Sequence, residues 1–144
     1  MKYIIKVTFI ASLILNGLSV AVAADENNDM RIALGLTSAE KAEFLSEMRQ
    51  MLASIQGIIS GIGDKDRELI IKSARLSGNR MARATPDSVR KKLPQSFKDI
   101  GGPTHMMFEE LVVRAETDEM DMLAEFTGRL MQQCITCHTM FKTD

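Results

Sequence analysis

The clearest chemical signal in this sequence is a pair of cysteines with a histidine directly after the second. Cys134 and Cys137 are separated by two residues and His138 follows at once, which gives the pattern C-x-x-C-H. On a helix the two thiols lie about one turn apart and share a face. This spacing is typical of covalent haem attachment, in which both thiols add across the vinyl groups of one porphyrin and the histidine binds its iron. We therefore expect one haem c, bound through Cys134 and Cys137, with His138 as the proximal iron ligand.

Other interpretations of the two cysteines fit less well. A dithiol redox pair of the thioredoxin type lies where a strand leads into a helix, and no such context is predicted here. A zinc site needs a fourth ligand, but the chain has no further cysteine and only one other histidine, His105. A structural disulfide would close too small a loop to add much stability. A haem-free dithiol or metal-binding helical protein remains an alternative.

The elements that must position this motif are predicted to be helices. The run 37–40 (Thr-Ser-Ala-Glu) is a capping box, and apolar residues then recur at steps of three and four from Phe44 to Ile62. No segment alternates with a period of two, so strands are not expected. The chain is predicted to be all-α, an antiparallel four-helix bundle with haem near one end. Its helices are expected over 37–63, over 65–82 with Asp64 as the cap, from Gly101-Gly102-Pro103 onward after a connection containing Pro86 and Pro94, and over about 117–141.

The motif lies on the last helix, and this placement resembles the class II c-type cytochromes, the cytochrome c′ family. The ending Cys137-His138-Thr139-Met140-Phe141-Lys142 is also similar to that family's C-H-x-x-F-[KR]. The resemblance covers about residues 37–142 and is specific only in the C-terminal motif. It implies that Phe141 packs near the haem and that Lys142 lies close to the proximal histidine.

The second axial ligand decides the function, because a histidine and a thioether together suit electron transfer, whereas an open site binds small gases. The resemblance implies a ligand from the first helix, about sixteen residues before the turn, and this position is Met48. Met51, on the same apolar stripe, is the alternative distal ligand. His105 is expected at the surface or as a helix cap, although it is a third option as a ligand. One departure from the family is Phe44, which stands where an arginine is frequent.

The N-terminus predicts export. Lys2 and Lys6 precede an apolar run, and Ala21-Val22-Ala23 fits the signal peptidase pattern, so we expect residues 1–23 to be a signal peptide cleaved near Ala23 or Ala24. The apolar run is too short to span a bilayer, so no stable membrane span is expected after cleavage. Residues 24–36 are expected to form a loosely packed N-terminal arm and residues 37–144 the four-helix-bundle cytochrome domain.

Together these features predict a periplasmic single-electron carrier rather than an enzyme. All 19 acidic residues follow residue 23, whereas two of the 18 basic residues precede it, so the mature chain is more acidic than the full chain with its net charge of −1. The basic residues are too scattered to bind nucleic acid. The expected partners are periplasmic redox proteins, and the resemblance also allows a homodimer. The principal alternative is a five-coordinate cytochrome c′ that binds NO or CO.

Overall fold

The computed structural model describes residues 29–143. The predicted signal peptide, its cleavage site near Ala23 or Ala24, and the first five residues of the predicted arm lie outside the described residues. Within them the chain is almost entirely helical, so the predicted all-α class is confirmed. The helices are α1 (Ser38–Asp64), α2 (Arg67–Leu76), α3 (Asn79–Ala84), α4 (Asp87–Lys92), α5 (Gln95–Thr117) and α6 (Met120–Met140).

The first helix begins as the sequence predicts. The Thr37 hydroxyl accepts a hydrogen bond from the Glu40 amide at 3.4 Å, and the Glu40 carboxylate accepts one from the Thr37 amide at 2.8 Å. The capping box is therefore present. At the other end Lys65 adopts a left-handed conformation, with φ of 58°, and its amide bonds back to the carbonyls of Gly61 and Ile62.

The prediction of a second helix over 65–82 is wrong at both ends, because α2 begins at Arg67 and ends at Leu76. Asp64 is the last residue of α1, and the cap of α2 is Asp66, whose carboxylate accepts from the Leu69 amide at 2.9 Å. The helix then stops at Leu76, and a separate short helix, α3, follows.

This interruption is set by a contact from α5. The Glu109 carboxylate accepts a hydrogen bond from the Asn79 amide at 2.7 Å, and a side chain at Gly78 would overlap that carboxylate. The chain can therefore approach α5 only at a glycine. A partner thirty residues away in the sequence leaves no trace in the local pattern.

The predicted start of the third helix is wrong, because the observed helix begins earlier in the chain. It was expected to start at Gly101-Gly102-Pro103, but α5 starts at Gln95 and runs through Pro103. Proline in a helix removes one amide donor and disfavours a helical conformation in the residue before it. Here that residue is Gly102, which has no Cβ to clash with the proline ring. The Thr104 hydroxyl also donates to the Ile100 carbonyl at 2.7 Å, within the same turn.

A short pair of strands joins the two ends of the described chain, although no strand was expected. β1 (Ile32–Ala33) and β2 (Phe141–Lys142) pair in parallel, with Ile32 opposite Phe141. The last helix therefore ends at Met140 rather than at Phe141. The arm is also better packed than expected, because Leu34 is buried.

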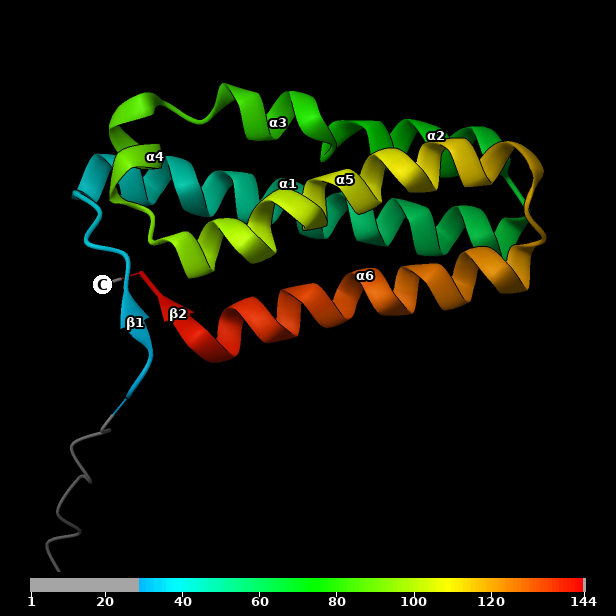
Figure 1. Ribbon diagram of the computed structural model, residues 1–144. Helices are drawn as coiled ribbons and strands as arrows, with labels where there is room; N and C mark the ends of the chain where they lie inside the picture. The colour runs from blue at the N-terminus through cyan, green and yellow to red at the C-terminus, as the bar shows by residue number, and fades with distance from the viewer. Residues whose placement is uncertain (1–28, 144) are drawn as a thin grey trace, which may run out of the picture.

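Four helices, α1, α2, α5 and α6, lie side by side and alternate in direction (Figure 1). α1 packs against α2, α2 against α5, α5 against α6, and α6 against α1. α3 and α4 connect α2 to α5, and α4 lies at the end where α1 begins and α6 ends (Figure 1). The same end holds the strand pair, so the two termini of the described chain meet beside the C-x-x-C-H motif.

Two apolar clusters fill the interior. The larger cluster is shared by α1, α2, α5 and α6. It consists of Ile55, Ile58, Ile70, Ala74, Phe108, Leu111, Val112, Ala115, Leu123, Phe126 and Leu130. The smaller lies at the end with the strand pair and consists of Leu34, Phe44, Val89, Leu93 and Phe141, with Met48, Phe97 and Cys137 packed against it. None of these eleven residues of the larger cluster lines the cavity described below, whereas most residues of the smaller cluster do.

Candidate functional site

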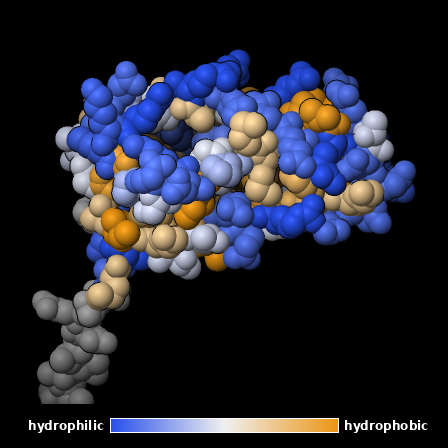
Figure 2. Space-filling model, in the orientation of Figure 1, coloured by the Kyte–Doolittle hydropathy of each residue, from blue (hydrophilic) through white to orange (hydrophobic). Residues whose placement is uncertain are grey.

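A cavity of about 640 Å³ opens at the end of the molecule that carries the strand pair. Figure 2 shows a hollow near this end, rimmed by hydrophilic side chains. Its volume lies in the range of pockets that hold a cofactor-sized ligand, roughly 300–1,000 Å³. The residues that line it include all six predicted site residues, namely Met48, Met51, Cys134, Cys137, His138 and Phe141.

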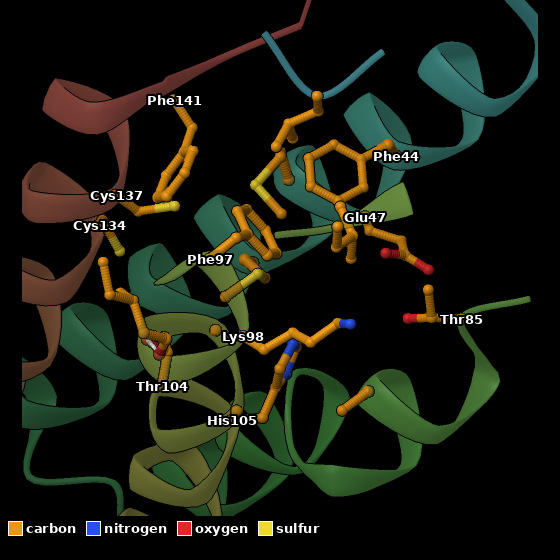
Figure 3. Close-up of a pocket in the computed structure, with 18 of the residues that line it drawn as sticks. Phe44, Glu47, Thr85, Phe97, Lys98, Thr104, His105, Cys134, Cys137 and Phe141 are labelled. Carbon is orange, nitrogen blue, oxygen red and sulfur yellow. Dashed lines mark hydrogen bonds between the residues drawn. The ribbon is translucent and has the colours of Figure 1, made fainter. Parts of the chain in front are cut away.

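The two cysteines form one wall of this cavity. Both are on α6, one turn apart, and both are free thiols that are half-buried. Figure 3 shows Cys134 and Cys137 on the same side of the cavity, with Phe141 beyond them. The shared helix face that the spacing predicts is therefore found, and it faces the cavity.

The environment of the thiols disfavours their ionised form. Burial raises the pKa of Cys134, and burial together with the nearby Cys134 thiol raises the pKa of Cys137. Redox-active cysteines have the opposite property, because the thiolate is the reactive species and needs a lowered pKa. The site thus presents two neutral thiols side by side.

His138 is exposed at the edge of the cavity, next to Cys137. Its backbone is held from the N-terminal arm, because the Arg31 guanidinium donates to the His138 carbonyl at 3.2 Å. Asp29 in turn accepts from Arg31 at 2.8 Å and lies 3.9 Å from the Lys142 amine. Lys142, which the resemblance places close to His138, is thereby fixed in the same cluster.

The wall opposite the cysteines comes from α1. Figure 3 shows Phe44 and Glu47 across the cavity from Cys134 and Cys137. Met48 and Met51 also line the cavity and are half-buried. The structure therefore brings the candidate thioether ligands and the C-x-x-C-H motif to one cavity from opposite ends of the sequence.

Aromatic rings close the end of the cavity near the strand pair. The ring of Phe97 lies 5.3 Å from that of Phe141 and 5.8 Å from that of Phe44, measured between centroids. Phe141 is buried in this group. Phe44 is one of its packing residues, which explains an apolar side chain at that position.

His105 is placed differently from the surface or capping role that we expected. It is half-buried and lines the cavity from α5. Its Nδ1 lies 2.7 Å from the Ser77 carbonyl oxygen, which can only accept, so Nδ1 carries the proton and donates. The lone pair of the neutral ring is then on Nε2. Ser77, which accepts this hydrogen bond, is itself buried, and its hydroxyl pairs with the Ser54 hydroxyl of α1 at 2.7 Å.

Sequence reasoning missed several polar residues of the cavity. Glu47, Thr85 and Lys98 line it from three different segments. Burial, followed by the nearby Glu43 carboxylate, raises the pKa of Glu47. None of the three belongs to a motif, and only the position of Glu47 beside Met48 could have indicated it.

No three histidine, cysteine or carboxylate side chains among residues 29–143 converge on a common metal position. No helix there has both the length and the apolar character to cross a membrane. Comparison with protein-family models, curated proteins and solved structures finds no match to this chain.

Proposed function

We propose that this chain is a monohaem c-type cytochrome that carries single electrons, with α1, α2, α5 and α6 forming the antiparallel four-helix bundle that the resemblance implies. One observation carries the proposal. Met48 on the first helix and the Cys134–His138 segment on the last helix line the same cavity, although they are far apart in the sequence. Nothing in the local sequence pattern requires this convergence.

The residues at the cavity fit a haem. The thiols of Cys134 and Cys137 share one wall, so both reach one edge of a porphyrin. Attachment is an addition: each sulfur bonds to a vinyl carbon and each thiol hydrogen goes to the adjacent carbon, so no oxidant is needed. His138 would hold the iron, together with Met48 or alternatively Met51. The haem supplies an iron that alternates between Fe(II) and Fe(III).

The rest of the site positions and shields this group. Phe44, Phe97 and Phe141 provide an apolar boundary that limits water at the ligands. Arg31 holds the backbone of His138 from the arm. The raised thiol pKa values disfavour the alternative of a redox-active dithiol, which requires a lowered pKa.

The location and partners follow from the predicted signal peptide. We propose that the mature protein acts in the periplasm and exchanges electrons with other periplasmic redox proteins. A homodimer through the first two helices is supported by large apolar side chains that are exposed there, Leu52 and Ile59 on α1 and Leu76 on α2. Leu52 and Ile59 lie about two turns apart on one face of α1, and contiguous apolar surface of this kind marks protein contacts.

Mass spectrometry of the full chain, exported by cells with haem-attachment machinery, tests the proposal. We expect a gain of about 616 Da that survives denaturation, together with loss of the residues before Ala24. The double variant C134A/C137A is the control and should lack the gain. Colourless wild-type protein with two free thiols would refute the proposal and favour the haem-free alternative.

A further inference from the structure

Several basic side chains line the cavity in addition to the proposed haem ligands. Basic side chains outnumber acidic ones along its walls: five basic residues line it, and Glu47 is the one carboxylate among its lining residues. Arg31 and Lys142 belong to the cluster around Asp29, beside His138. The other three, Arg83, Arg90 and Lys98, come from α3, α4 and α5.

Lys98 is the cation of this group that faces the interior. Its side chain is half-buried, and Figure 3 shows its amine inside the cavity near Glu47, Thr85 and His105. Among residues 29–143 it has neither a hydrogen bond nor an ion pair through its side chain. Arg90 differs, because its guanidinium donates to the Thr85 carbonyl at 2.9 Å.

The half-buried amine of Lys98 is available to an anionic group that enters the cavity. Removing an ammonium group from water is unfavourable unless it is paired and hydrogen-bonded. Glu47 lies on the facing helix but makes no ion pair with Lys98 in the described chain. An anion that pairs with Lys98 would therefore be supplied by a bound ligand.

Resting on the proposed function, we propose that Lys98 binds a propionate carboxylate of the haem. Vinyl and propionate groups occupy opposite edges of the porphyrin. Bonds from Cys134 and Cys137 at one wall would thus leave the carboxylates away from that wall, on the side toward which the Lys98 amine extends in Figure 3. The groups that face this position are Glu47 of α1, Arg83 of α3, Arg90 of α4 and His105 of α5.

The pH dependence of the reduction potential of the holoprotein tests this assignment. Ionisation of a propionate stabilises Fe(III), so the potential falls as pH rises through the pKa of that propionate. A neighbouring cation keeps this pKa low, and in K98M we expect the inflection to move up by about one pH unit, a tenfold weaker acid. K98R should restore the wild-type profile. K91M, which removes an exposed lysine of α4 outside the cavity, should leave it unchanged.

Two further measurements keep the test decisive. The profile is repeated in E47Q, because Glu47 faces the same position; an inflection that E47Q abolishes belongs to Glu47 and overturns the assignment. Acetylation of wild-type lysines, read by mass spectrometry, should show Lys98 protected in holoprotein relative to apoprotein, and Lys91 equally labelled in both. Equal labelling of Lys98, or a K98M profile identical to wild type, would also overturn it. Absence of attached haem in the wild type is a different result, since it refutes the proposed function itself.

Discussion

The guanidinium of Arg31 donates a hydrogen bond to the backbone carbonyl of His138, 107 positions further along the chain, at 3.2 Å. The N-terminal arm is therefore tied to the residue that we propose as the proximal iron ligand. The parallel pairing of Ile32 with Phe141 extends this contact on the next residues. A segment expected to be a loosely packed arm thus forms part of the site.

The first prediction concerns this contact. R31A should loosen the arm, and we expect the Leu34 amide, which bonds to the Lys142 carbonyl at 3.1 Å, to exchange its hydrogen about two to five times faster. R49A, at an exposed position on α1, is the matched control and should not alter this amide. Amide hydrogen exchange measured by NMR tests this prediction. An unchanged exchange rate at Leu34 in R31A would mean that strand pairing alone holds the arm.

The second prediction identifies the distal ligand. Replacing Met48 with alanine removes the only side-chain atom there that can bind iron, so a low-spin absorption spectrum should become high-spin. M51A should retain the wild-type spectrum, as should M122A at an exposed position on α6.

Other outcomes of this experiment assign the ligand elsewhere. Conversion in M51A alone would identify Met51 instead. If neither variant converts, H105A becomes the deciding variant, since Nε2 of His105 bears a lone pair beside the cavity. A wild-type protein that is already high-spin and binds carbon monoxide at once would favour the gas-binding alternative.

The third prediction is a pH dependence of stability at the start of α1. Hydrogen bonds from the Lys92 amine, at 2.6 Å, and from the Thr37 amide lower the pKa of Glu40 to about 2. Unfolding returns this carboxyl to about 4.3. Because the folded chain binds the proton more weakly, Glu40 stabilises the fold above the unfolded pKa, and this contribution is lost as pH falls from about 4.3 to about 2.

Urea unfolding across this pH range measures the effect. E40Q should show a weaker decline in stability than the wild type between about pH 4.3 and about pH 2. E43Q, at an exposed position on the same helix, should follow the wild-type curve more closely. Parallel curves for wild type and E40Q would exclude Glu40 as a source of acid sensitivity.

The fourth prediction tests the close approach of α1 and α2. A Cβ at Gly57 would overlap the Ser73 hydroxyl and lie 2.9 Å from Ser73 Cβ. G57A should therefore destabilise the fold by about 1–3 kcal/mol, the usual cost of overpacking. The double variant G57A/S73G should recover part of this loss.

Gly63, also in α1, provides the contrast. A Cβ there meets nothing within 4 Å, so G63A should leave stability unchanged or raise it by up to about 1 kcal/mol, because alanine favours helix. Chemical denaturation of the three variants gives the comparison. Equal effects of G57A and G63A would mean that the two helices adjust freely at Gly57.

Features that depend on residues close in the sequence could be predicted. The capping box at Thr37 and Glu40 involves partners three residues apart, so its geometry follows from helix formation itself. The shared face of Cys134 and Cys137 follows in the same way from helical periodicity. The all-α class follows from apolar residues repeated at helical spacing along most of the chain.

Features that depend on partners far away in the sequence could not be predicted. The break after Leu76 needs the Glu109 carboxylate, and the end of α6 before Phe141 needs Ile32 from the arm. Lys98 lines the cavity from the first turns of α5, which lie before Pro103, and the proline pattern argued against helix there. Periodicity fixes which residues share a helix face, because that depends only on the repeat of the backbone. Which faces then meet depends on packing between segments far apart in the chain, and only the tertiary structure decides it.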